Sequence, residues 1–144
     1  MLQRVHEAHV TVDEKMIGKV GNGLVLFIGI AQTDTESDVN YTADKCAMLR
    51  VFADAENKMN RSVIDVNGEV LAISQFTLLG DITRGRRPSF IGAADPERGE
   101  MFYQMFVSRL REHELHVETG IFGAMMDVYL VNAGPVTLII DSKR

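Results

Sequence analysis

Polar side chains interrupt an apolar run near the middle of the chain. The run begins at Val70 and is typical of a buried strand, but Ser74, Gln75 and Thr77 follow it directly. Hydroxyl and amide groups at the end of a core strand either satisfy one another and the local backbone or remain free for a ligand. A threonine hydroxyl could also attack a carbonyl if a base activated it. The stretch from Val70 to Asp81 is therefore the first candidate site.

No base accompanies these hydroxyls in the sequence. The histidines are elsewhere, at His6, His9, His113 and His116. His113 and His116 have no third ligand nearby, so we expect a solvated helix end and no metal. The single cysteine, Cys46, lies between apolar residues of a predicted helix, and we interpret it as a small core side chain. The sequence indicates no cofactor.

A second candidate lies near the end of the chain, where Asn132-Ala133-Gly134-Pro135 separates two β-rich runs. Proline cannot donate to a strand ladder, so this one must lie at an edge or a turn. The pattern alone predicts a rigid turn between two strands.

Three positive charges gather in the segment Arg84-Gly85-Arg86-Arg87. These side chains could contact phosphate groups of a nucleic acid, or they could form a solvated turn paired with surface acids. The protein as a whole is acidic, with 20 acidic and 15 basic side chains and a formal charge of −5. This balance argues against a protein that coats nucleic acid through bulk electrostatics, and DNA is not an expected partner.

The length and composition of the chain favour one domain, residues 1–144, with a substantial core. No apolar run approaches the roughly 20 residues of a membrane span, and a secretory leader is not evident, so we expect a cytoplasmic protein without a membrane partner. One cysteine fits a reducing compartment.

The elements that must position these residues are two helices and five or six strands. An opening hairpin is expected around residues 9–12 and 20–30, with a kink at Gly21-Asn22-Gly23. Asn67-Gly68 predicts a second hairpin that leads into the run at Val70. The last strands are expected at 128–131 and 136–140. Strands at both ends of the chain indicate an α+β domain on a curved or barrel-like, mostly antiparallel sheet.

The two helices have recognisable starts. Thr35 or Ser37 could cap a helix that runs to about Phe52. Asp95-Pro96 predicts the start of another, which ends near Glu112. Apolar residues at helical spacing predict the buried faces of the two helices: Ala43, Cys46, Leu49 and Phe52 in the first, and Met101, Phe102, Met105, Phe106 and Leu110 in the second.

Over its whole length the chain resembles the D-aminoacyl-tRNA deacylases, the D-tyrosyl-tRNA deacylase family. Five motifs carry the resemblance in the family's order: Lys58-Met59-Asn60, Ser74-Gln75-Phe76-Thr77-Leu78, Arg84-Gly85-Arg86-Arg87-Pro88-Ser89-Phe90, Thr119-Gly120-Ile121-Phe122 and Asn132-Ala133-Gly134-Pro135-Val136-Thr137. The family usually has aspartate where this chain has Ala133. Its absence leaves the bracing of the following turn in question, because aspartate could hold that turn through local hydrogen bonds.

The resemblance implies a homodimer in which Gly134-Pro135, joined by a cis bond, reaches into the partner's active site. The carbonyl groups of this dipeptide would hold the substrate's amino group and leave no space for an L side chain. Arg4 matches the arginine that holds the dipeptide. The catalytic wall opposite would be Ser74, Gln75, Phe76 and Thr77, and the pocket lining would include Ala94, Phe122 and Met126.

The implied reaction is hydrolysis of the ester of D-aminoacyl-tRNA to a free D-amino acid and tRNA, a proofreading step in translation. The terminal 2′-hydroxyl of the tRNA would help to activate water, which makes Thr77 a positioning group. A site that excludes L side chains should also admit glycine mischarged on tRNA(Ala). Two alternatives remain: a small-ester hydrolase with Thr77 or Ser74 as nucleophile, and a non-catalytic tRNA-binding module.

Overall fold

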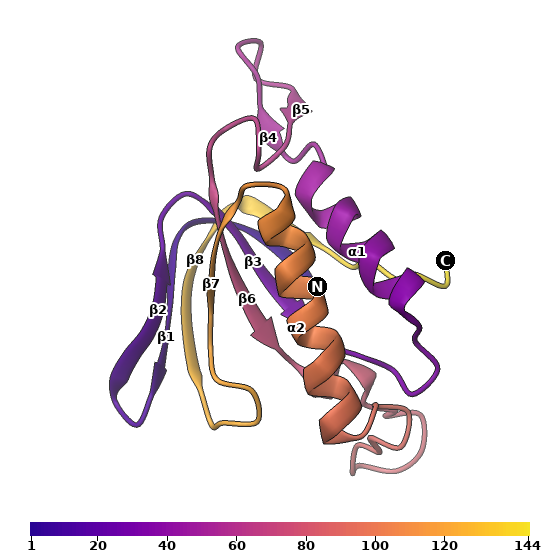
Figure 1. Cartoon of the computed structure of the whole chain (residues 1–144). Coiled ribbons are helices and arrows are strands. Elements are labelled where there is room, and N and C mark those ends of the chain that lie inside the picture. The colour runs from indigo at the N-terminus through magenta and orange to yellow at the C-terminus, as the bar shows by residue number, and fades with distance from the viewer.

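The computed structural model describes all residues, 1–144. One twisted sheet forms the body of the protein, and two helices cover one of its faces (Figure 1). In chain order the elements are β1 (Leu2–Val12), β2 (Lys15–Val20), β3 (Gly23–Ile28), α1 (Glu36–Met48), β4 (Phe52–Ala53), β5 (Met59–Arg61), β6 (Glu69–Ser74), η1 (Phe76–Leu79), α2 (Pro96–Glu112), β7 (His116–Thr119) and β8 (Asp127–Leu138).

An opening hairpin forms, but its second strand begins earlier than predicted, at Lys15, and the expected strand over residues 20–30 is divided between β2 and β3. Asp13 and Glu14 make its two-residue turn, both with positive φ, as expected for the turns that match the twist of antiparallel strands. β2 and β3 then pair in succession with the same edge of β1, and the expected kink at Gly21-Asn22 separates them. A side chain on Gly23 would collide with the backbone of Glu69, so the chain needs glycine where β3 begins beside β6.

The sheet is mixed and nearly closes into a barrel. β1 pairs antiparallel with β2, β3 and β8, whereas β6 pairs parallel with both β3 and β7. At the seam, a Cβ on Gly18 of β2 would lie only 2.8 Å from the carbonyl oxygen of Thr119 in β7. The α+β class, the barrel-like sheet and the two main helices are confirmed. The parallel pairs arise because a helix connects β3 to the β6 region and another connects β6 to β7.

The hairpin predicted at Asn67-Gly68 is wrong. Residues 62–67 form successive turns, and only Asn67 of the pair has positive φ. The Ser62 amide donates to the Asp65 carboxylate at 2.8 Å, and the Asp65 amide donates to the Ser62 hydroxyl at 3.1 Å. These local side-chain bonds satisfy the backbone that a strand would otherwise have used.

Both helix starts are confirmed. Thr35 caps α1 in a capping box with Asp38, and Asp95 caps α2 with Pro96 at its first position. The predicted end of the first helix at Phe52 is wrong, since α1 ends at Met48 and the chain becomes extended. That change of direction lets Val51 and Phe52 enter the core.

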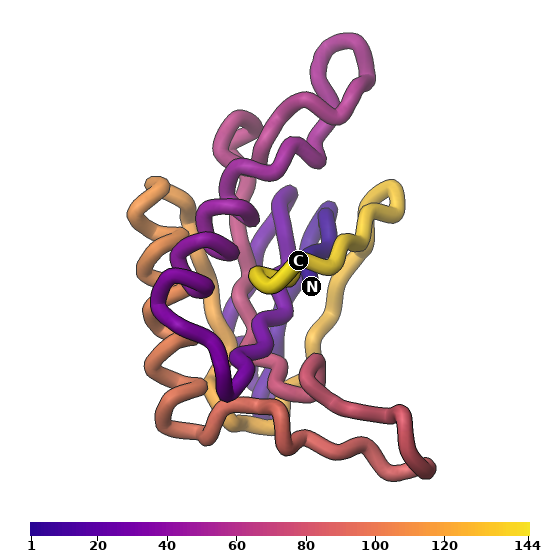
Figure 2. The backbone as a smooth tube through the Cα atoms, turned by 90° about the vertical axis from the view of Figure 1, so that its right-hand side faces the viewer, coloured from indigo at the N-terminus to yellow at the C-terminus, as the bar shows by residue number.

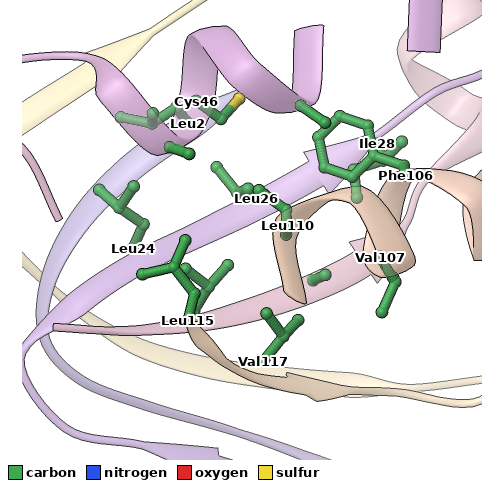
Figure 3. Close-up of a cluster of buried hydrophobic side chains, with 14 of the residues drawn as sticks. Leu2, Leu24, Leu26, Ile28, Cys46, Phe106, Val107, Leu110, Leu115 and Val117 are labelled. Atoms are coloured by element: carbon green, nitrogen blue, oxygen red, sulfur yellow. The ribbon is translucent and has the colours of Figure 1, made fainter. Parts of the chain in front are cut away.

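The core between the helices and the sheet is apolar and contiguous (Figure 3). α2 contributes Phe102, Tyr103, Phe106, Val107 and Leu110, as its spacing largely predicts, but Met101 is 52% exposed and lies outside this face. Cys46 is buried against the same cluster, and burial raises the pKa of its thiol to about 12. The thiol is therefore a core side chain, as the sequence indicates. Neither α1 nor α2 has the length and apolar composition required to cross a membrane.

Candidate active site

The polar stretch after Val70 forms a short, well-anchored turn. β6 ends at Ser74, and the chain enters the 3₁₀ turn η1 one residue later. The Gln75 amide donates to the carbonyl oxygen of Ile28 at 2.8 Å, which extends the pairing with β3 past the end of β6. The side-chain amide of Gln75 also donates to the Thr77 hydroxyl. We call residues 74–77 the wall, because their polar groups share one turn at the carboxyl end of β6.

Ala94 is attached to the same strand end. Its amide donates to the carbonyl oxygen of Ile30 at 2.9 Å, and Ala93 forms an isolated bridge with Ala31. Ile28, the last residue of β3, therefore binds the wall, and Ile30, two residues further along the chain, binds Ala94. Segments that are far apart in the sequence are brought together by backbone bonds to one core strand.

Phe122 and Met126 complete this end of the sheet. The Phe122 ring would be 3.5 Å from a Cβ on Gly99, so it lies against the first turns of α2 just beyond Ala94. A Cβ added to Gly120 would contact the Met126 sulfur and the end of the Ile73 side chain, so both side chains lie next to Gly120. Because Ile73 directly precedes the wall, Met126 lies beside the end of β6. The structure thus gathers all seven residues expected to line the pocket of one protomer around a single strand end.

Gly134-Pro135 forms a bulge in β8, and the predicted turn between two separate strands is wrong. Asn132 pairs with Val5 and Thr137 pairs with Gln3, so residues 133–136 stand opposite Arg4 alone. We call residues 133–136 the bulge. Both residues of the dipeptide are exposed, and their peptide bond is cis. The strand resumes its pairing afterwards because the extra residues are extruded from the ladder.

Arg4 and Asn132 hold the bulge from both sides. The Arg4 Nε donates to the carbonyl oxygen of Ala133 at 3.1 Å. The Asn132 amide nitrogen, in the orientation that satisfies its neighbours, donates to the carbonyl oxygens of Arg4 at 2.9 Å and Val136 at 3.1 Å. Its oxygen accepts from the Thr137 hydroxyl at 3.0 Å. Sequence reasoning missed the role of Asn132, although an amide next to a Gly-Pro pair at a strand interruption is a usable signal. Asn132 and Arg4 therefore brace the bulge in this chain, where position 133 is alanine.

Within one protomer the wall and the bulge lie at levels near opposite ends of β3. Arg4 pairs with Leu24 of β3, and Ser74 pairs with Ile28. At about 3.3 Å per residue, these levels are roughly 13 Å apart along the strands, and β1 and β3 lie between β8 and β6. In Figure 2 the yellow loop that contains the bulge lies in the upper half of the view and the turn after β6 lies in the lower half. The structure therefore does not bring the two motifs together in a single chain.

The arginine segment forms a loop beside the wall, and the two ends of this loop are paired through backbone hydrogen bonds. Asp81 and Ser89 exchange backbone hydrogen bonds of 2.7 and 2.9 Å, and Phe90 packs edge-on against Phe76 with ring centroids 5.1 Å apart. Arg84, Arg86 and Arg87 are exposed at the tip and form no ion pair within the protomer. We call residues 82–88 the arginine loop. Its three free positive charges are available to an anionic partner.

Large apolar side chains lie exposed beside these features. Phe76 and Leu78 flank Thr77 with exposed fractions of 55% and 43%. Further exposed apolar residues occur in the arginine loop and just after it, and along β8: Ile82, Phe90, Ile91, Tyr129, Val131, Leu138 and Ile139. Of these, Ile139 lines the same hollow as Leu78, so exposed apolar side chains from η1 and from the end of β8 lie close together there.

The histidines take no part in the wall or the bulge. The Nε2 of His113 donates to the Asp44 carboxylate at 2.7 Å, and Arg109 donates to both oxygens of the same carboxylate at 2.8 Å. No group of three histidine, cysteine or carboxylate side chains is arranged to hold a metal ion. Neither the wall nor the dipeptide carries an ionisable side chain. A hydroxyl of the wall that acted as a nucleophile would therefore need a base from outside these two motifs.

The comparisons with known proteins agree with one another. A profile of the D-Tyr-tRNA(Tyr) deacylase family matches residues 1–141. The D-aminoacyl-tRNA deacylases of Bacillus cytotoxicus and Bacillus cereus are each 56% identical to the chain over 143 residues, which is 99% of the chain and 98% of each relative. A solved structure described as c-Myc DNA Unwinding Element Binding Protein has a TM-score of 0.89 at 39% identity, covering 95% of this chain and 93% of that one. A structure described as a probable eukaryotic D-amino acid tRNA deacylase has a TM-score of 0.79 at 16% identity, covering 90% of each chain, and shows a shared fold.

Proposed function

The chain belongs to the D-Tyr-tRNA(Tyr) deacylase family and hydrolyses the ester bond of D-aminoacyl-tRNA, and from this premise we propose that its active site is shared between two protomers. In this homodimer the bulge of one protomer enters the site formed by the wall of its partner. The observation that carries the proposal is the separation of the two motifs. Gly134, Pro135 and Thr77 are exposed, yet the two motifs lie roughly 13 Å apart along the strands with β1 and β3 between them, which supports a site completed by a second chain.

The exposed apolar surface supports the same arrangement. Phe76 and Leu78 are exposed beside the wall, Leu78 and Ile139 line the same hollow, and Leu138 and Val131 are exposed on β8, the strand that carries the bulge. A two-fold interface uses the same patch on both protomers, so one patch containing both motifs would place each bulge near the opposite wall. Burial of these side chains would provide the apolar centre of such an interface.

The bulge selects chirality by exclusion. The carbonyl oxygens of Gly134 and Pro135 accept hydrogen bonds from the substrate's ammonium group and occupy the space that an L side chain would need. A D side chain points away from the bulge, into the region of Ala94, Phe122 and Met126. Arg4 and Asn132 fix the bulge through hydrogen bonds, so the bulge does not move aside to admit an L side chain.

The wall positions the ester. Thr77 and Gln75 orient the terminal adenosine and the carbonyl group, and the 2′-hydroxyl of the tRNA assists the attacking water. A threonine nucleophile would need a base, and the wall contains none. The arginine loop contacts phosphates of the acceptor end. The enzyme acts in the cytoplasm, where charged tRNA is used.

Matched pairs of D-tyrosyl- and L-tyrosyl-tRNA test the proposal most directly. The purified enzyme should release the D-amino acid and leave the L ester at its spontaneous rate. Release from both would show that the chiral filter proposed here is absent, and release from neither would contradict the hydrolase activity itself. Simple D-tyrosyl esters without tRNA should be poor substrates, because they lack the 2′-hydroxyl; rapid turnover of them would favour a small-ester hydrolase.

Mixed dimers test the shared site. Gly134→Ala should damage the bulge, since Gly134 has φ +112° and a Cβ there would collide with the Arg4 guanidinium. Thr77→Ala damages the wall. Each variant alone should be impaired, whereas dimers formed from one protomer of each kind contain one site with an intact bulge and an intact wall. Each mixed dimer should therefore have up to half of the activity of a wild-type dimer. The absence of any restoration on mixing would place both motifs in the same protomer.

A further inference from the structure

Gly29 lies between the two backbone anchors of the active site. The carbonyl group of Ile28 accepts from Gln75, and that of Ile30 accepts from Ala94, at 2.8 and 2.9 Å. The single residue between these anchors has no side chain. Its φ is outside the left-handed region, so the backbone there would accept any residue, and only space can explain the glycine.

The space beside Gly29 is filled by the turn that carries the wall. A Cβ at this position would lie 3.2 Å from the carbonyl oxygen of Gln75 and 3.2 Å from the Cβ of Leu78, and it would overlap the end of the Leu79 side chain. The first two contacts involve backbone or near-backbone atoms that cannot turn away. Gln75 and Leu78 bracket Thr77 in the chain, so an atom added at Gly29 must displace the turn itself.

The opposite side of the turn is equally close. A Cβ on Gly80 would be 3.0 Å from the carbonyl oxygen of Thr77 and 2.9 Å from the Phe90 ring. The Gly80 amide also donates to that carbonyl oxygen at 3.0 Å. The turn thus contacts the end of β3 on one side and Gly80 and Phe90 on the other, while Gly29, Leu78 and Leu79 also border a cavity of about 420 Å³.

We propose that Gly29 is a positioning residue for ester hydrolysis, because the missing side chain lets η1 seat directly on β3 and fixes Thr77 and Gln75 against the substrate. The proposal rests on the role given above to the wall. Gly29 does not touch the substrate. A displacement of a few tenths of an ångström there would shift the wall relative to Ala94, while the arginine loop, to which we assign the phosphate contacts, lies outside the displaced turn.

Gly29→Ala and Gly92→Ala form a matched pair for the test. Gly92 lies in the same region of the chain as Ala94, but a Cβ added there would meet no atom within 4 Å, and its φ is also ordinary. Gly29→Ala should lower kcat for D-tyrosyl-tRNA by about tenfold, since misplacement by 1 Å can cost about a hundredfold. KM and tRNA affinity should remain within about twofold of wild type, and Gly92→Ala should match wild type in all three.

A second variant separates positioning from loss of folding. Leu79→Ala removes the side chain that the new methyl group would overlap, so Gly29→Ala combined with Leu79→Ala should recover part of the kcat lost in Gly29→Ala alone. A structural role would instead give a double variant that is less stable and less active than either single one. Melting temperatures and circular dichroism of all four proteins identify that outcome, which would overturn the proposal.

The result also separates this inference from the role of the wall. A wild-type kcat in Gly29→Ala overturns the inference whatever Thr77→Ala does. A reduced kcat in Gly29→Ala together with normal hydrolysis by Thr77→Ala would support the proposal that η1 must pack directly on β3 at Gly29. It would also show that another member of the wall, such as Gln75, positions the ester.

Discussion

The Nη1 of Arg4 donates to the carbonyl oxygen of Val51 at 2.7 Å, so the arginine beneath the bulge is also fixed to the segment that follows α1. One guanidinium therefore connects three parts of the chain: β1, the bulge in β8 and the entry to β4. The planar fork of arginine can bond to two carbonyl groups at once, which a lysine ammonium on a flexible stem does less well.

Replacement of Arg4 by methionine should damage both stability and activity. The change removes the donors to Ala133 and Val51, and an unsatisfied buried carbonyl costs about 1–3 kcal/mol. We expect the free energy of unfolding to fall by about 2 kcal/mol and the D-ester rate to fall by about tenfold. Urea unfolding and deacylation assays measure the two effects. Arg4→Lys should be intermediate, and Arg144→Met, at an exposed position, should change neither; equal behaviour of the two methionine variants would remove Arg4 from the site.

Thr77→Ala should reduce hydrolysis by about ten- to a hundredfold without abolishing it, because the proposal makes the hydroxyl a positioning group. Binding of uncharged tRNA should be unchanged. Single-turnover rates on D-tyrosyl-tRNA measure the effect, with Thr77→Ser as the matched variant that keeps the hydroxyl. Complete loss of hydrolysis with intact tRNA binding, or a covalent acyl-enzyme trapped by acid quenching, would instead make Thr77 the nucleophile.

Glycyl-tRNA should be a substrate, since glycine has no side chain for the bulge to exclude. We expect glycyl esters to be hydrolysed at least about tenfold faster than L-alanyl esters on the same tRNA(Ala), from which they differ by one methyl group. D-alanyl-tRNA(Ala) is the positive control. Equal resistance of the glycyl and L-alanyl esters would mean that the site requires a D side chain, and selection by exclusion alone would be wrong.

The arginine loop should contribute to tRNA binding through charge. Replacement of Arg84, Arg86 and Arg87 by glutamine should weaken binding and reduce the slope of log K against log salt by about two, at about 0.7–0.9 per phosphate contact. Filter binding between 50 and 200 mM salt tests this expectation. The matched control, in which Lys15, Lys19 and Arg144 become glutamine, has the same net charge. An unchanged slope in the loop variant, or an equal change in the control, would contradict specific phosphate contacts.

The protein should lose stability in acid partly through Asp44. Hydrogen bonds from Arg109 and then from His113 lower the pKa of this carboxyl to about 2. A depressed folded-state pKa stabilises the fold above the unfolded value of 3.8, and that contribution disappears as the pH falls from about 4 towards 2. Solvent screening at this partly exposed site limits it to about 1 kcal/mol. Asp44→Asn should therefore flatten the decline in unfolding free energy between pH 5 and pH 2, as measured in urea, whereas Glu100→Gln on the exposed side of α2 should not.

Local chemistry made part of the fold predictable. The caps at Thr35 and Asp95 depend on a few adjacent residues, so sequence reasoning found them. The hairpin at Asn67-Gly68 failed because Ser62 and Asp65 offered the same backbone competing hydrogen bonds. A turn dipeptide decides the structure only when its neighbours leave the backbone free.

The residues of the site were easier to identify than their arrangement. Family motifs indicated the wall and the bulge, but the anchors at Ile28 and Ile30 are main-chain carbonyl groups of an ordinary apolar strand. No residue type marks such groups in a sequence. The bulge was also hidden, because its extra residues become visible only through the register of β8 against β1.

The bulge has a further effect on β8 that concerns aggregation. β8 runs for 12 residues and pairs only with β1, so its other side presents a row of free backbone groups. Long, regular strands of this kind are templates for unwanted strand addition. Gly134-Pro135 interrupts the row with a kink and with a residue that has no N–H to offer. The same two residues can therefore protect newly made protomers from sticking edge to edge before they find their proper partner.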